Sequence, residues 1–389
     1  KHIKKKTTDR VTVNIDQSFD KTVIMELAVF SFLLGVNLIG ISIAEPVVVS
    51  GDHQEIEMRR VLNGQVIKTI KIKEYDDIRL AVFYEQDVIF YASDKKVYMI
   101  ELLDDNGLPT LSNKGLLLTD PLADHRETQI YEFQYTVWSI AIDKVRRKLI
   151  ICELSDIYEM DFDGTGLRKI LTDGYRFNAI QIVGNQLYFS DRIAAHWKSH
   201  YGIYRMTIAP NKTISRTSST PEFHQIVGGH KEDVISMMVE KSTKKLFFRH
   251  GTNSICVVDT NLPAANYPVQ SPRVVIADSQ YVDGWGGIAV HGNRLVWNRK
   301  LSSNGQLLLG LMNKDLNFLS KRNIYVYGKA RYGYLPRQLD IFDHLFPTKA
   351  PAPVTTLQPT TKGQCMCPCA CSAKANSYMK SAKKLQKVH

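Results

Sequence analysis

Near the end of the chain, four cysteines alternate with other residues, at Cys365, Cys367, Cys369 and Cys371. Thiolates at such close spacing suit zinc or copper, and in an oxidising compartment the same groups form disulfides. No apolar run surrounds them to build a packed core, so the four do not easily all pair with one another. We expect disulfides between copies of the chain, with thiolate metal binding as the alternative.

Other groupings do not amount to a catalytic or metal site. Asp161-x-Asp163-Gly164 resembles the start of a calcium loop, but the glutamate that closes such a loop does not follow. His196 and His200 would share a metal only if a helix placed them on one face, and we expect a loop there. The sequence contains no nucleophile elbow, phosphate loop or zinc helix motif. We predict that the protein is not an enzyme and uses no cofactor, with no catalytic or metal-binding residue.

Short strands are the elements that must position any site in this chain. From Ser139 to Leu171, four apolar runs are separated by charged or glycine-containing turns, and the same plan restarts at Asn178. Such runs are typical of antiparallel strands, and four strands followed by a restart indicate a propeller blade. The hairpins of this kind are 78–82 with 88–94, 139–143 with 149–153, 178–182 with 187–191, 235–239 with 246–250, and 288–290 with 295–299.

The two ends of the folded region complete the set. Another first strand, Leu339–Phe342, has no hairpin after it, whereas Val47–Gly51 and 56–67 look like outer strands that lack a first strand. A ring closes when these segments share one blade, and closure removes the exposed sheet edges. We therefore predict an all-β fold, a six-bladed β-propeller of four-stranded antiparallel blades at residues 45–346.

Individual residues link this pattern to a known family. Leu187–Asp191 resembles the Leu-Tyr-Trp-Thr-Asp core of the repeats that build low-density lipoprotein receptor propellers, and Asp161–Leu171 resembles the turn and last strand of that repeat. Residues 336–344 are similar to the segment that closes those propellers. The chain thus resembles a divergent member of the YWTD-type, or class B repeat, six-bladed propeller family. The resemblance implies the fold and a general binding role.

Departures from the family limit what the resemblance implies. Glu153, His250 and Arg299 stand where the family usually has Asp, and Ala92 stands where it has Trp. The disulfide-rich modules that normally flank such propellers do not occur in this sequence, so endocytic-receptor behaviour is not carried over. The cysteines of the propeller region fall in strands of different blades, and we expect both to be buried free thiols. They are Cys152 and Cys256.

The predicted binding face follows from the propeller plan. Loops that enter each first strand share one face with loops that follow each second strand, and related propellers bind ligands on that face. Aromatic and arginine side chains around a shallow funnel suit a protein-binding site. The tryptophans there have an alternative role as packing residues between blades. The predicted binding residues are Trp138, Arg176, Asn178, His196, Trp197, His200, Glu232, Asp233, Trp285 and Arg337.

Segments outside the propeller indicate secretion. Residues 27–44 carry no charge and end in Ser-Ile-Ala, the small-x-small pattern of a cleavage site. We predict a signal peptide at 25–44, with 1–24 outside the mature protein; the alternative is a signal anchor. A Pro/Thr-rich linker at 347–364 and a Cys- and Lys-rich tail at 365–389 are expected to be disordered. Asn211 begins the single N-glycosylation sequon.

Charge and organisation lead to three functional hypotheses. Seven of the basic residues and no acid lie in 347–389, so the net charge of +11 does not indicate a nucleic-acid groove. The first hypothesis is a secreted, extracellular, non-enzymatic binding or matrix protein whose propeller face binds an extracellular protein or glycan. Its tail would link chains into disulfide-bonded homo-oligomers, and we expect no membrane association once the signal peptide is removed.

The alternative is a small-ligand-binding propeller of the yellow and royal-jelly type, to which the chain is similar in size and secretion. Least favoured is a propeller hydrolase or lactonase, which needs acids in the central tunnel. The first strands around the tunnel are apolar, and Asp143 and Asp340 are the main acids near it.

Overall fold

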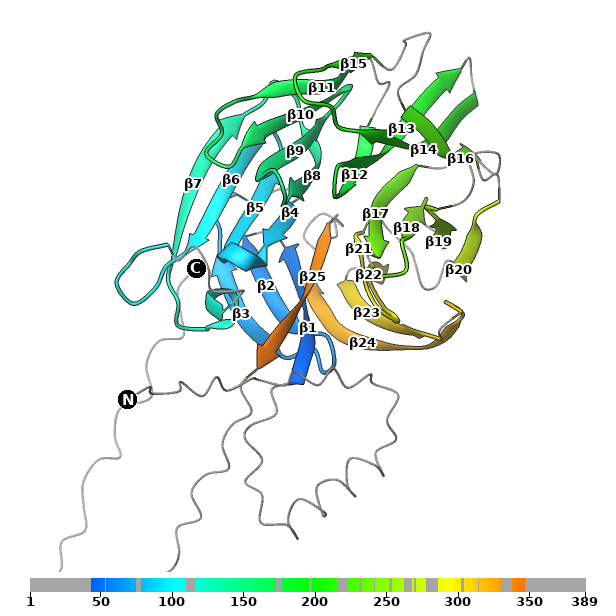
Figure 1. The fold of residues 1–389 in the computed structure, drawn as a ribbon. Coiled ribbons are helices and arrows are strands. Elements are labelled where there is room, and N and C mark those ends of the chain that lie inside the picture. Colours follow the sequence, from blue (N-terminus) through cyan, green and yellow to red (C-terminus); the bar gives the residue numbers. More distant parts are fainter. Residues whose placement is uncertain are drawn as a thin grey trace, which may run out of the picture. The chain divides into compact units, whose positions relative to one another are not determined.

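The computed structural model describes residues 43–346, apart from gaps at 53, 75–77, 110–115, 173–176, 196–197, 216–222, 231–232, 241, 252–253, 262–267, 269–270, 278–285, 302–303, 314 and 330–337. The strands form six sheets, five with four strands and one with five (Figure 1). Their first strands contact one another in the order β4, β8, β12, β17, β21 and β25, and β25 returns to β4. The predicted all-β, six-bladed propeller is confirmed. Within the described ranges, no helix is long and apolar enough to cross a membrane.

We number the blades along the chain. Blade 1 contains β4 (Arg79–Phe83), β5 (Val88–Ser93), β6 (Lys96–Leu102) and β7 (His125–Glu132). Blade 2 contains β8 (Val137–Asp143), β9 (Lys148–Glu153), β10 (Asp156–Asp161), β11 (Arg168–Thr172) and β15 (Ile214–Ser215). Blade 3 contains β12 (Phe177–Val183), β13 (Gln186–Ala195), β14 (Lys198–Thr207) and β16 (Phe223–His230).

Blade 4 contains β17 (Val234–Glu240), β18 (Lys245–His250), β19 (Ser254–Asp259) and β20 (Arg273–Ala277). Blade 5 contains β21 (Ile288–His291), β22 (Arg294–Leu301), β23 (Asn304–Met312) and β24 (Phe318–Lys329). Blade 6 contains β25 (Leu339–Phe346), β1 (Ile43–Asp52), β2 (Glu55–Arg60) and β3 (Val66–Lys71). The short helices are η1 (Tyr84–Gln86) and α2 (Leu116–Thr119).

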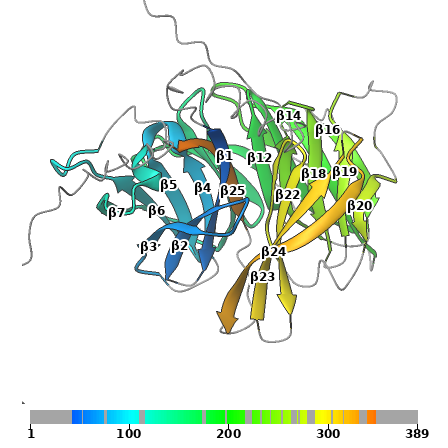
Figure 2. The same ribbon diagram turned by 90° about the horizontal axis from the view of Figure 1, so that it is seen from below.

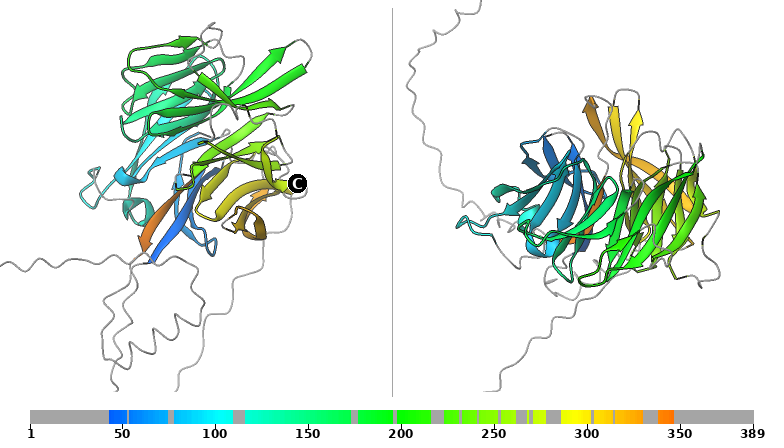
Figure 3. Two further views of the ribbon diagram at one scale, coloured as in Figure 1. Left: turned by 45° about the vertical axis from the view of Figure 1, so that its right-hand side comes forward. Right: turned by 90° about the horizontal axis from the view of Figure 1, so that it is seen from above.

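Packing between blades explains the nearly continuous apolar runs of the inner strands. Each blade is covered by a neighbour on both faces, so both sets of alternating side chains are buried, and all five residues of β4 are buried. Second strands supply most of the largest buried side chains, including Phe90, Phe189 and Trp297, each 0% exposed. The blades stack face to face (Figures 2 and 3). The hydrophobic core is thus a set of layers between them.

Blade 6 joins the two ends of the folded region, as predicted. β25 pairs with β1 in an antiparallel register that runs from Ile43↔Phe346 to Ser50↔Leu339. Val47, Val48 and Val49 are each 0% exposed, so the joint is also packed on both faces. The first two residues of β1 are the last two residues of the predicted signal peptide. Cleavage after Ala44 would leave the pairs from Glu45↔His344 onward.

Two segments differ from the sequence-based expectation. The range 56–67 is divided, because the chain turns after Arg60 and β3 begins at Val66. The predicted loop after Asp191 is instead a continuation of the β13–β14 hairpin, whose pairing extends to Ala195↔Lys198. The expected loop was wrong because the antiparallel register continues past the end of the apolar run. Blade 5 carries a similar extension, in which β22 and β23 pair as far as Leu301↔Asn304.

The turn that resembled a calcium loop is closed by its own residues. Asp163 Oδ1 accepts hydrogen bonds from the Thr165 backbone N–H at 2.9 Å and hydroxyl at 2.7 Å. These hydrogen bonds lower the pKa of Asp163, and the bond from the Thr165 hydroxyl has the largest effect. Gly164 has φ +87, and a Cβ there would lie 2.1 Å from the Ile130 carbonyl oxygen. Only glycine fits this turn, which presses against the neighbouring blade.

Two buried polar residues, Lys68 and Asp87, each attach the segment between β6 and β7 to the propeller. Lys68 Nζ donates to the carbonyl oxygens of Asp120 at 2.7 Å and Ala123 at 2.5 Å. Asp87 is 0% exposed, and its Oδ1 accepts from the Leu118 N–H at 2.9 Å. Burial raises the pKa of Asp87 to about 6, against the opposing effects of the backbone N–H groups and Lys68.

Replacing Asp87 by Asn is expected to alter how stability depends on pH. A carboxyl whose pKa is raised on folding contributes stability that is fully present below its ordinary pKa of 3.8 and lost as pH rises through about 6. Between about pH 7.5 and 4.5, the unfolding free energy of the wild type should therefore gain about 2 kcal/mol relative to Asp87→Asn. Urea titrations at both pH values measure this difference. Asp105→Asn, an exposed change in the same segment, is the control and should track the wild type.

Candidate functional site

A cavity of about 600 Å³ lies on the axis of the ring and is lined by the first strands of all six blades. Its walls combine aliphatic and methionine side chains with many polar groups, and the polar and apolar parts of the surface are of similar extent. The lining includes residues of the turns between first and second strands, such as Tyr84, Val145 and Ser242. From the loops that enter the first strands, the lining includes Gln338. The cavity therefore extends from Gln338 to these turns, which lie on the face opposite the predicted binding face.

Side chains from one blade satisfy backbone groups on the first strand of the next. Asp340 Oδ2 accepts the Val82 N–H at 2.8 Å, which joins blade 6 to blade 1. The hydroxyl of Ser139 accepts the Ile180 N–H at 3.2 Å between blades 2 and 3. Between blades 4 and 5, Ser236 accepts the Ile288 N–H at 3.3 Å. A first strand has no strand partner on its axial side, so these bonds replace a missing ladder.

Gln338 makes a connection of the same kind that reaches past one whole blade. Its Nε2 donates to the Ile140 carbonyl oxygen at 2.6 Å, and its Oε1 accepts the Ile140 N–H at 3.3 Å. Residue 338 precedes β25 in blade 6, whereas Ile140 is in β8 of blade 2, and blade 1 stands between them. The side-chain amide thus imitates a strand edge at the end of the cavity nearest the entry loops.

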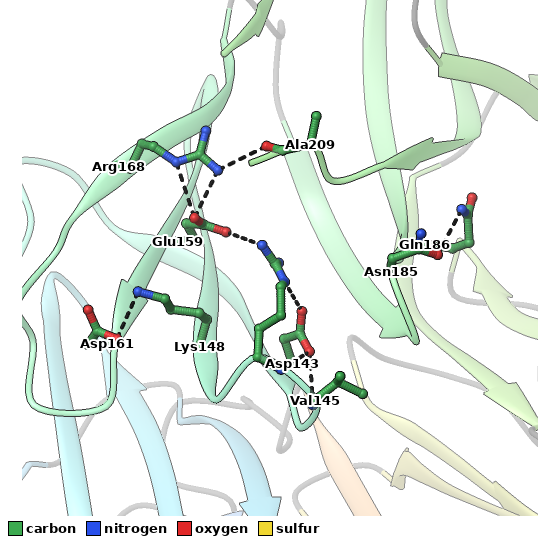
Figure 4. A network of polar contacts seen from close by, with 10 residues as sticks. Asp143, Val145, Lys148, Glu159, Asp161, Arg168, Asn185, Gln186 and Ala209 are labelled. Carbon is green, nitrogen blue, oxygen red and sulfur yellow. Dashed lines mark hydrogen bonds and ion pairs between the residues drawn. The ribbon is translucent and has the colours of Figure 1, made fainter. Parts of the chain in front are cut away.

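Asp143, an acid predicted near the tunnel, belongs to an ion-pair network. This 2%-exposed residue accepts hydrogen bonds from the Val145 and Arg146 N–H groups at 3.0 Å and from Arg146 Nε at 2.5 Å. Arg146 also pairs with Glu159 at 2.9 Å, and Arg168 completes the series on Glu159 at 2.8 Å (Figure 4). The carboxylate of Asp143 is therefore committed to holding the first turn of blade 2.

The remaining charged groups at the cavity also have partners. Lys144 Nζ lies 2.9 Å from Glu85 and 4.3 Å from the centre of the Tyr84 ring, which links the turns of blades 1 and 2. Glu240 accepts hydrogen bonds from the Thr243 N–H at 2.6 Å and the Ser242 hydroxyl at 2.8 Å. Burial acts to raise the pKa of Glu240, but these hydrogen bonds outweigh it and the pKa is lowered. Glu240 is thus held as an anion.

Gln181 was missed by the sequence analysis, which counted it within an apolar lining. It lies on β12, is half-buried and lines the cavity. Its neighbours Ile180 and Ile182 are buried on the opposite face of the strand, in the core shared with blade 2. The signal was present in the sequence, because a glutamine interrupts an otherwise apolar run of a first strand.

Three predicted binding residues are described with their side chains. Trp138 is half-buried, and its ring lies 5.8 Å from the Arg79 guanidinium of blade 1, as its alternative packing role requires. Asn178 is 8% exposed, and neither its Oδ1 nor Asp233 Oδ1 has a hydrogen-bond partner among the described residues. For His200 the structure gives the backbone only, opposite Ile193 in the β13–β14 hairpin. The predicted residues outside the described ones are Arg176, His196, Trp197, Glu232, Trp285 and Arg337.

Of the predicted cysteine and glycosylation sites, those in the propeller are described by the structure and those in the tail are not. Cys152 and Cys256 are free, buried thiols, as expected, and burial raises the pKa of both. Asn211 is exposed at φ +57, in the turn that leads to β15. The hydroxyl of Thr213, the third residue of the sequon, donates to the Lys169 carbonyl oxygen at 2.7 Å. The tail cysteines Cys365, Cys367, Cys369 and Cys371 lie outside the described residues.

Replacing Gln338 by Met is expected to destabilise the propeller by about 1–3 kcal/mol. A methionine of similar length leaves the Ile140 N–H and C=O without partners in a partly enclosed site. The exposed Gln129, whose side-chain contacts are at 3.4 Å, provides the control Gln129→Met, with a change below about 0.5 kcal/mol. Urea unfolding measures both. Equal effects would show that the Gln338 bridge contributes nothing specific.

Comparison with known proteins supports the fold and does not identify a family. The chain matches no family model and no curated protein. Among solved structures it is similar to TolB from Acinetobacter baumannii, with a TM-score of 0.50 and 13% identity over 82% of this chain and 71% of TolB. It is also similar to apo AztD from Citrobacter koseri, with a TM-score of 0.38 and 9% identity over 77% of this chain and 99% of AztD. At such identities the likeness to TolB shows a shared β-propeller architecture, and the YWTD-type resemblance stays a resemblance.

Proposed function

We propose that this chain is a secreted, non-enzymatic binding protein that holds a small ligand in the central cavity of its propeller. The observation that carries the proposal is the cavity itself, because about 600 Å³ lies in the size range of small-molecule sites. Apolar side chains combined with polar groups that are held in place occur in such sites. Among the hypotheses raised by the sequence, this geometry favours the small-ligand propeller.

The state of the acids supports binding over catalysis. A general acid or base needs a pKa near the working pH and a free position towards the substrate. Asp143 is paired with Arg146, Asp340 accepts a backbone N–H, and Glu240 is held as an anion by its hydrogen bonds. Each acid of the lining therefore has a structural partner. A hydrolase or lactonase is accordingly disfavoured.

A second candidate is recognition of an extracellular protein or glycan on the entry face. The specific observation is a pair of buried side-chain oxygens, the amide oxygen of Asn178 and a carboxylate oxygen of Asp233, which lack donors within the described ranges. Asn178 belongs to blade 3, and Asp233 directly precedes the first strand of blade 4. The Ser190 hydroxyl connects the two blades, because it accepts the Ala179 N–H and donates to the Val234 carbonyl oxygen. Hydroxyl or amide groups of a partner would satisfy such oxygens. Tyr135, 49% exposed, adds an aromatic surface on the same face.

A binding assay with a neutral fluorescent probe tests the cavity. Prodan, a naphthyl ketone whose emission shifts in apolar surroundings, is expected to bind the full chain with one-to-one stoichiometry. Val145 is 81% exposed at the cavity, so Val145→Trp narrows the opening without disturbing the core and should weaken binding about tenfold or more. Val274→Trp, on the outer strand β20, is the matched control and should leave binding unchanged. Failure of the wild type to bind prodan saturably would refute the cavity function.

Expression in secreting eukaryotic cells tests the extracellular part of the proposal. We expect the protein in the medium, with an N-glycan that disappears in Asn211→Gln, since Asn211 is exposed. Non-reducing electrophoresis should show disulfide-linked oligomers, and replacing the four tail cysteines by Ser should leave monomers. Retention of the chain inside the cell would argue against secretion. Unchanged oligomers in the serine variant would exclude linkage through the tail.

A further inference from the structure

We infer that Gln181 is the residue that anchors the ligand in the cavity, and that the ligand is an uncharged molecule carrying a hydrogen-bonding group. The inference rests on the cavity function proposed above and adds the chemical class of the ligand. Two independent features of the lining carry it. One is the hydrogen-bonding capacity of Gln181, and the other is the distribution of charge around it.

Gln181 lies on the cavity side of a well-fixed strand. Its backbone pairs with Tyr188 in β13, and it shares a strand face with Ala179 and Val183, which pack towards blade 4. The side chain is half-buried and lines the cavity beside residues of β17. A rigid strand holds a polar group in place better than a loop does. Gln181 thus offers a positioned primary amide to the interior.

The amide of Gln181 differs from the other polar groups of the lining because no described residue competes for its hydrogen bonds. Within the described part of the chain, no hydrogen bond engages its side chain, whereas Ser236, Gln338 and Asp340 each bind a backbone group. A primary amide provides two N–H donors and one carbonyl acceptor. A ligand carbonyl or hydroxyl group would complete these bonds. Gln181 is therefore the lining residue best suited to select among ligands.

Charge around the cavity favours an uncharged ligand. Carboxylates of the lining outnumber its ammonium group, which disfavours anions. A cation would have to displace existing partners, because Asp143 is bound by Arg146, Asp340 by the Val82 N–H, and Glu240 by Ser242 and Thr243. Lys144 is likewise paired with Glu85. An uncharged ligand leaves these pairs in place, and the amide of Gln181 orients it.

Matched probes on the full chain separate these contributions. Prodan and 2-(dimethylamino)naphthalene share an aromatic amine, but only prodan has a carbonyl group. We expect the wild type to bind prodan about three- to tenfold more tightly than the amine, the value of one hydrogen bond. Gln181→Leu should lose this preference while still binding 2-(dimethylamino)naphthalene. Gln129→Leu, an exposed change on β7, should keep it. Circular dichroism and melting temperature check that each variant is folded.

The binding results distinguish a failure of the anchoring role of Gln181 from a failure of the cavity function. If the wild type binds neither probe, the cavity function itself fails. If both probes bind and Gln181→Leu keeps the preference for prodan, the anchoring role is overturned while the cavity function stands. The charged analogues 2-naphthalenesulfonate and trimethyl(2-naphthyl)ammonium test the ligand class, and tighter binding of either one than of 2-(dimethylamino)naphthalene would overturn the assignment of an uncharged ligand.

Discussion

The structure depends on satisfying the axial edge of each first strand. Every first strand pairs with a second strand on one side only, so its remaining N–H and C=O groups face the axis of the ring. In this protein, side chains of other blades supply several of the missing partners. Ser139, Ser236 and Asp340 each reach the next blade, and Gln338 reaches past one blade to Ile140. These bonds fix the blades against one another around the axis, where hydrophobic packing alone would leave polar groups exposed to the cavity.

This requirement also decides what remains for function. Most polar side chains near the axis are used to complete the fold, and the ion pairs of Arg146 and Lys144 tie the turns of blades 1 and 2 together. A polar residue near the axis is therefore not in itself evidence of catalysis. Gln181 differs from those side chains, since it lies in the same lining and its side chain makes no hydrogen bond to a neighbouring blade among the described residues. On the entry face, Asn178 and Asp233 likewise each have a side-chain oxygen without a hydrogen-bond partner among the described residues.

The sequence predicted the architecture well because its signals are local. Alternating runs bounded by turns located the hairpins of blades 1 to 5, and the unmatched segments at the two ends located blade 6. The pairing of β13 with β14 beyond Asp191 escaped prediction, since the residues there lack an apolar alternation. The face on which the cavity opens also escaped it, because turns such as 144–147 look like ordinary charged connections until the ring brings them together. Partners separated by many residues, such as Gln338 and Ile140, carry no sequence signal that a single chain reveals.

The shared blade has a mechanical consequence. β1 and β25 are antiparallel, and Ile43 faces Phe346, so the two ends of the propeller leave it from the same end of one strand pair. A force applied between these ends would act across the hydrogen bonds at that end and break them one after another. It would not load all of them together, as a shearing pull along the strands does. The buried valines of β1 stabilise this joint by packing, whereas a pull on the two termini would separate the strand pair one hydrogen bond at a time.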